Sequence, residues 1–97
     1  MSSAHALFHY SITCHTDDRA VLYCLRSLAD FAEQHPRKKI AWGNTGDDAW
    51  TRDGHQVTFH FTEPSYRQVF REKANNLLGG RWNEERACDN NPATPKK

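Results

Sequence analysis

Alternating apolar and polar positions predict two β-strands, over residues 8–15 and 56–62. A period of two places successive side chains on opposite faces, which is typical of a strand with one buried face. The apolar positions are Phe8, Tyr10, Ile12, Cys14, Val57, Phe59 and Phe61. We expect these side chains in the core, and we expect the histidines, serine and threonines between them on a polar face.

Helical spacing predicts a first helix over residues 17–35. Thr16 can cap its start, and Pro36 ends it. Asp17 and Asp18 stand in the first turn, where the helix dipole favours negative charge. The expected apolar stripe is Val21, Leu25, Leu28 and Ala32, flanked by Cys24 and Phe31. We expect Cys24, like Cys14, to be a small core residue.

A second helix is predicted between Thr62 and Gly79. Thr62 can cap it, proline suits a first helical turn, and Gly79-Gly80 ends it. Its expected apolar stripe is Tyr66, Phe70, Ala74 and Leu77, with Val69 beside it. We expect Leu25, Leu28, Phe70 and Leu77 to bury the helices against the sheet.

The remaining segments complete an alternating order of strands and helices. Residues 39–43 predict a short strand, residues 43–54 a loop around Trp50, and residues from Arg81 onward an edge strand. The expected fold class is α+β: a ferredoxin-like βαββαβ arrangement with an antiparallel sheet and two helices on one face. Residues 1–88 would form a single domain, and residues 89–97 a polar flexible tail.

Composition narrows the class of protein and its compartment. The chain has 97 residues, no apolar run long enough to span a membrane, and no basic and apolar leader typical of a signal peptide. Three cysteines without a CxxC pair favour reduced thiols and a cytoplasmic location. The net charge of +1 does not favour a protein that binds nucleic acid over its whole surface.

Charge is distributed unevenly once the predicted topology sorts the loops to the two ends of the sheet. One end, here called the acidic end, carries Asp17, Asp18, Asp47, Asp48 and Asp53, with Glu84 and Glu85 nearby and Arg19 and Arg52 opposing them. The opposite end carries Lys38 and Lys39. One interpretation is an acidic patch that imitates DNA phosphates; the other is solvated loops with helix-capping carboxylates.

Two short motifs suggest alternative functions. His9-x-Ser11 and His60-x-Thr62 resemble the paired motifs of two-histidine phosphoesterases, in which one imidazole acts as base and the other as acid. The other interpretation is a pair of solvent-facing histidines. Arg67, Arg71 and Lys73 lie away from the apolar stripe of their helix, as in a nucleic-acid-binding ferredoxin-like domain or in an ordinary solvated face. The spacing of the histidines does not favour a metal site.

In size, predicted topology and the aspartates of its loops, the chain resembles the small anti-CRISPR proteins of phages and mobile elements. The resemblance implies a non-enzymatic inhibitor in the host bacterial cytoplasm that binds a type I (I-F-like) surveillance complex and blocks target DNA binding. Its implied partners are protein subunits around a basic DNA channel. It implies no cofactor, metal, membrane or direct nucleic-acid contact, and a monomer. The contact residues would be those of the acidic end, with Trp50 as an exposed anchor.

Overall fold

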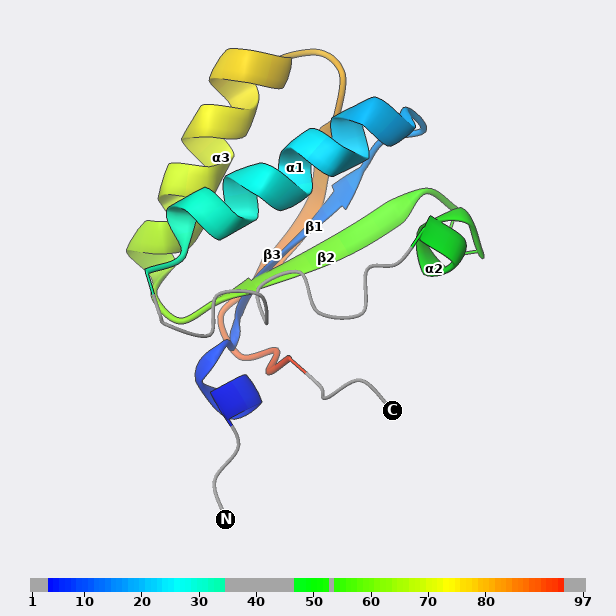
Figure 1. The fold of residues 1–97 in the computed structure, drawn as a ribbon. Helices are drawn as coiled ribbons and strands as arrows, with labels where there is room; N and C mark the ends of the chain where they lie inside the picture. The colour runs from blue at the N-terminus through cyan, green and yellow to red at the C-terminus, as the bar shows by residue number, and fades with distance from the viewer. Residues whose placement is uncertain (1–3, 35–46, 53, 94–97) are drawn as a thin grey trace.

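The computed structural model describes residues 4–34, 47–52 and 54–93 (Figure 1). The strand expected over residues 39–43 lies outside the described residues, as do Lys38, Lys39 and Asp53. The elements are a 3-10 helix Ala4–Leu7, β1 Tyr10–His15, α1 Arg19–Ala32, α2 Asp47–Arg52, β2 Gln56–Phe61, α3 Pro64–Leu78 and β3 Asn83–Cys88. No helix among them is long and apolar enough to cross a membrane.

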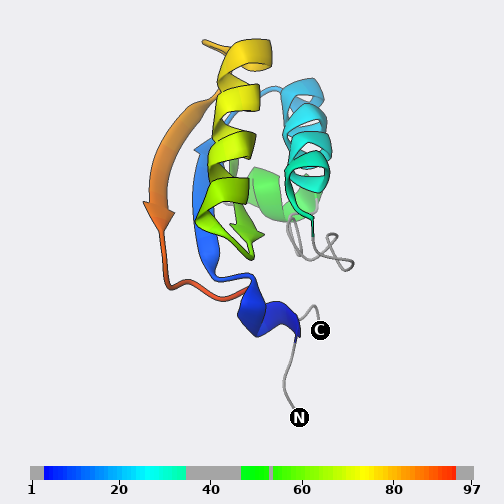
Figure 2. The same ribbon diagram turned by 90° about the vertical axis from the view of Figure 1, so that its left-hand side faces the viewer.

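The described sheet is antiparallel and has β1 at its centre, in the order β2-β1-β3. Ile12 pairs with Phe59 on one side and with Ala87 on the other. A β-bulge interrupts the pairing of β1 with β3 between Thr13 and Cys14. Both long helices cover one face of the sheet (Figure 2). The expected α+β class is therefore confirmed, with three strands in the described part of the chain.

The core lies between the sheet and the two helices. Phe59 and Phe61 pack against Phe70 of α3, with ring centroids 5.1 and 5.5 Å apart. The predicted core is confirmed at Phe8, Ile12, Cys14, Leu25, Val57, Phe59, Phe61 and Phe70. Tyr10 and Leu28 are partly buried and pack against this core. The apolar face expected from the alternation therefore faces the helices.

Two expected core residues are at the surface instead. Leu77 is 67% exposed, and its neighbour Leu78 packs against the core. Cys24 is also exposed, because the buried face of α1 is centred on Leu22, Leu25 and Ala29. Both corrections have one physical reason: the buried stripe of each helix is rotated relative to the expected one, so that neighbouring positions take up the core contacts.

The helix ends differ from the expected ones. Asp18, not Thr16, caps α1, which begins at Arg19 and ends at Ala32. The N-cap of α3 is Glu63, and its side chain makes no capping hydrogen bond. A short helix, α2, occurs where a loop was expected.

Residues 89–93, expected in the flexible tail, contact the start of β1. The amides of Asn91 and Ala93 donate to the carbonyls of His9 and Phe8, at 2.9 and 3.0 Å. Ala93 is buried. These contacts extend the folded unit beyond residue 88.

Candidate functional site

Thr16 joins three segments at the acidic end. Its amide donates to the carbonyl of His55 at 3.1 Å, and its hydroxyl donates to the carbonyl of Arg81 at 3.1 Å. Its own carbonyl accepts from Nε1 of Trp50 at 2.8 Å. The β1–α1 junction, α2 and the chain after α3 therefore meet at one end of the sheet, as the topology predicted.

Asp17 and Asp18 stand at the start of α1 and differ in their use. The Asp18 Oδ1 atom accepts from the amides of Ala20 and Val21 at 2.8 and 3.4 Å. These bonds satisfy donors that the first turn of a helix leaves unpaired. Asp18 therefore serves as a helix cap, while Asp17 beside it is exposed.

Glu84 and Glu85 differ in the same way. The two oxygens of Glu84 accept from Nε and Nη2 of Arg71 at 2.7 and 3.0 Å. This bidentate salt bridge connects β3 to α3, and the bidentate geometry is favourable for a pair of arginine and carboxylate. Glu85 is exposed on the edge strand. The Glu84 carboxylate is thus structural, and the Glu85 carboxylate faces solvent.

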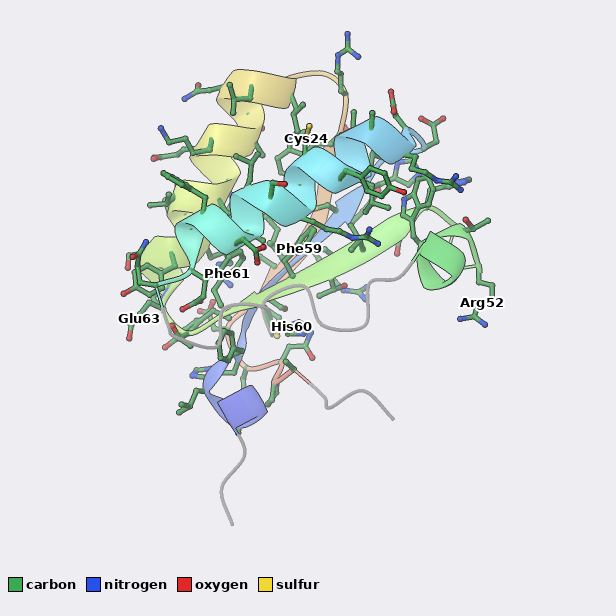
Figure 3. The ribbon with its side chains drawn as sticks, in the orientation of Figure 1. Cys24, Arg52, Phe59, His60, Phe61 and Glu63 are labelled. Carbon is green, nitrogen blue, oxygen red and sulfur yellow. The ribbon has the colours of Figure 1, made fainter. Side chains whose placement is uncertain are left out.

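The remaining acidic residues lie on the segment before β2. Asp47 and Asp48 begin α2, which the Trp50 side chain attaches to Thr16. Arg52 ends this helix and extends away from the body of the protein (Figure 3). Among the acidic residues whose side chains the structure describes at this end, Asp17 and Glu85 are the exposed ones that neither cap a helix nor hold Arg71.

The expectation that Trp50 is an exposed anchor is wrong. Its exposed fraction is 4%. Besides its bond to Thr16, the indole packs edge-on against His55 at 4.8 Å, and the Arg19 guanidinium lies 5.9 Å from its ring. Most residues next to Trp50 in the sequence are polar. Within α2, the large apolar side chain of Trp50 is the one that points into the protein.

The two histidine motifs have their polar groups engaged elsewhere. The Thr62 hydroxyl donates to Glu33 at 2.6 Å, and the Ser11 hydroxyl accepts from Asn91 at 3.1 Å. His9 Nδ1 lies 2.7 Å from the carbonyl of Asp89. Burial lowers the pKa of His60 to about 4, so this imidazole is neutral at pH 7. A neutral imidazole does not supply the proton that the acid of a two-histidine enzyme must donate.

The basic residues of α3 are mainly structural. Nη1 of Arg67 donates to the carbonyls of Ser11 and Cys88 at 3.2 and 3.0 Å. Its Nη2 atom pairs with Asp89 at 2.7 Å. Arg71 is paired with Glu84. Arg67 and Arg71, two of the three basic residues considered for nucleic-acid binding, therefore attach β3 to α3. In the described residues, no group of three histidine, cysteine or acidic side chains could hold a metal ion.

Sequence reasoning missed an apolar groove between α1 and α3. The groove has a volume of about 400 Å³ and is lined by Tyr23, Cys24, Ser27, Leu28, Phe31, Leu77 and Leu78. Phe31 is 61% exposed and Tyr23 is 47% exposed. The available signal was Cys24 and Phe31 beside the apolar stripe, which make that stripe wider than one buried face requires.

Comparison with protein-family models, with curated proteins and with solved structures finds no match to this chain. The function must therefore be argued from the geometry alone.

Proposed function

We propose that this protein is a non-enzymatic inhibitor that binds protein subunits around a basic DNA path through its acidic end. The observation that carries the proposal is the convergence of three segments on Thr16, because it brings Asp17, α2 and the start of β3 to one end of the sheet. A type I (I-F-like) CRISPR surveillance complex is the proposed target. Blocking of its target DNA is the proposed effect.

The bonds within the acidic end support this proposal by fixing the surface before any partner arrives. Asp18 caps α1, Glu84 holds Arg71, and Trp50 attaches α2. These bonds therefore hold the backbone next to Asp17 and Glu85, and the helix α2 that begins at Asp47, at the same end of the sheet. Carboxylates that need little ordering lose less entropy on binding, and complementary charge speeds association with a lysine- and arginine-lined path.

The proposal extends to the complete fold. The order β2-β1-β3 with antiparallel pairing agrees with three strands of a ferredoxin-like sheet. In that arrangement residues 39–43 would supply the fourth strand beside β2. The segment leading into α2 would then leave the sheet at the acidic end.

A competition experiment tests the proposed function. A purified type I-F surveillance complex is mixed with labelled target duplex and increasing amounts of this protein, and DNA binding is measured. The wild type is expected to displace the duplex. At least about tenfold more of the Asp47→Lys/Asp48→Lys variant should be required to displace the duplex, which corresponds to a loss of about 1.4 kcal/mol in binding free energy. This difference from the wild type should be smaller at high salt.

Reversal of the two lysines that the predicted topology places at the opposite end of the sheet provides the matched control. Lys38→Glu/Lys39→Glu also changes the net charge by four units, with the opposite sign, and should leave competition nearly unchanged. A larger loss in this control than in the aspartate variant would overturn the acidic-end proposal and favour a basic contact surface. Failure of the wild type to compete at all would reject the proposed target.

The non-enzymatic part of the proposal has its own assay. Cyclic phosphodiesters and 2′,5′-linked oligonucleotides are incubated with the protein, and products are separated by chromatography. We expect no turnover, and His9→Ala and His60→Ala should still compete for the surveillance complex. Turnover by the wild type that both substitutions abolish would contradict the proposal of a non-enzymatic inhibitor and favour a phosphoesterase.

A further inference from the structure

The strand β3 lies at the border of the described sheet and has one edge without a partner strand. It pairs with β1 on one side, and no described strand pairs with its other side. The chain after it turns toward the start of β1, where the amides of Asn91 and Ala93 are bonded, and does not run back along β3 (Figure 2). All six residues of β3 are exposed. The outer edge can therefore receive a strand of another chain through backbone hydrogen bonds.

The two central residues of β3, Glu85 and Arg86, carry opposite charges, and both are exposed. Among the described residues, neither side chain forms an ion pair or a hydrogen bond, whereas Glu84 beside them is held by Arg71. Glu85 is also the extra residue of the β-bulge and has no partner on β1. The centre of this edge thus carries two charges for which the described part of the chain provides no partner.

We infer that the outer edge of β3 pairs with β3 of a second copy of this chain, antiparallel and about a twofold axis. When the six residues of one strand lie opposite the six of the other, Glu85 faces Arg86 of the second copy. The twofold axis repeats this pair, so Arg86 faces Glu85 of the second copy. Opposite charges at directly opposed positions stabilise an antiparallel pair of strands. Glu84 faces Ala87 of the second copy, whose small side chain leaves the salt bridge of Glu84 with Arg71 in place.

Charge selects this register over its neighbours. A shift by one residue in one direction places Glu85 opposite Glu85 of the second copy, and a shift in the other direction places Arg86 opposite Arg86. Like charges directly opposite each other are destabilising. A charged, bulged edge strand discourages pairing with unrelated strands. A second copy in the full-length register is favoured, because it supplies the opposite charge at both central positions.

The contact is small, so the dimer should be weak. One strand edge from each copy falls at the low end of interface sizes, where complexes are transient. Charge pairs at an exposed edge also weaken as the salt concentration rises. We therefore expect association at high protein concentration and low ionic strength. The product is one continuous sheet in which the two β3 strands lie side by side at the centre.

Sedimentation equilibrium of the full chain tests the inference, at low salt, up to about 1 mM protein, and with a reductant that keeps the exposed Cys88 from forming disulfides. The wild type is expected to dimerise. Glu85→Arg and Arg86→Glu should each weaken dimerisation about tenfold, because either reversal turns two attractive pairs into two repulsive ones. Glu85→Arg/Arg86→Glu should restore it. An equimolar mixture of the two single variants should associate at least as tightly as the wild type, because their strands carry fully complementary charges.

Matched controls make the same changes of charge at exposed positions outside β3. Arg52→Glu on α2 and Glu63→Arg before α3 should leave dimerisation unchanged (Figure 3). Circular dichroism checks that every variant is folded.

Three outcomes would overturn the inference. The first is a wild type that stays monomeric at every concentration. The second is single variants of β3 that dimerise as well as the controls, which would place any contact elsewhere. The third is a double reversal as weak as the single ones, which would contradict the register. The inference does not rest on the proposed function, because the measurement uses this chain alone and its failure leaves the competition experiment unaffected.

Discussion

Glu33 accepts two hydrogen bonds from Thr62, one from the backbone amide at 2.9 Å and one from the hydroxyl at 2.6 Å. Glu33 is the C-cap of α1, and Thr62 lies between β2 and α3. The glutamate is buried, with 1% of its surface exposed. The pair therefore connects the end of one helix to the start of the other beneath the protein surface.

Replacing Thr62 with valine should lower the free energy of unfolding by about 2 kcal/mol, because a hydrogen bond to a buried charged group is worth about 1.5–3 kcal/mol. Urea denaturation followed by circular dichroism measures the change. Thr62→Ser keeps the hydroxyl and should retain most of the stability. Equal stability of the valine variant and the wild type would contradict a structural role for this bond.

Acid should destabilise the protein through His60. Burial lowers the pKa of its folded form to about 4, against an unfolded value of about 6.5. The unfolded chain therefore takes up a proton between these values that the folded chain does not. The stability due to neutral His60 is complete above pH 6.5 and is lost as the pH falls toward 4, to the extent of about 2–3 kcal/mol.

Urea midpoints at pH 7 and pH 4.5 measure this dependence. His60→Gln should show a smaller drop between the two pH values than the wild type, because the carboxylates titrate in both proteins and the imidazole in one. Proton NMR of the His60 ring gives the pKa directly. A ring that titrates near pH 6.5 in the folded protein would rule out the effect.

The three thiols should react in two classes. Cys24 and Cys88 are exposed and Cys14 is buried. Burial raises the pKa of the Cys14 thiol, with a smaller contribution from Glu84, and the thiolate is the reactive form. A colorimetric thiol reagent should therefore titrate two groups quickly in the native protein, and the third in denaturant. Rapid reaction of all three would show that β1 is accessible.

Trp50→Phe should reduce stability rather than remove an exposed binding anchor. The substitution leaves the carbonyl of Thr16, a buried residue, without its indole donor. An unsatisfied buried acceptor costs about 1–3 kcal/mol. Thermal melting measures the loss, and competition for the surveillance complex at a temperature where both proteins are folded measures binding. Unchanged stability combined with weaker competition would restore the anchor interpretation.

Strands β1 and β2 could be predicted because their apolar and polar side chains alternate, and their apolar faces pack against the helices. The open polar face is found in β2, but it is wrong for β1, where Ser11 and Thr13 are also buried. All six residues of β3 are exposed, so their side chains carry no alternation. This strand is held by backbone pairing with β1 and by Arg67 and Arg71, and neither is visible in a pattern of hydrophobicity. Only Gly79-Gly80 before it indicated that a new element begins.

The acidic end could be predicted in its location but not in its use. Topology alone brings Asp17 and Asp18 near the chain that follows α3. Which carboxylate faces solvent depends on particular partners, such as the amides that Asp18 caps and the guanidinium that Glu84 holds. The groove was not predicted because it depends on whether Leu77 or Leu78 faces the core. The rotation of α3 about its own axis decides this, and the spacing of apolar residues determines that rotation only to within about one residue.

The central position of β1 has a consequence for how the chain reaches this fold. Ser11 pairs with His60 on one side and with Cys88 on the other, so neither ladder of the described sheet is a local hairpin. The backbone groups of β1 can form their sheet hydrogen bonds only with strands that lie far along the chain. Sheets built from such distant pairings fold slowly. During synthesis α1 is available early, but β1 stays half-paired until residues 83–88 have left the ribosome.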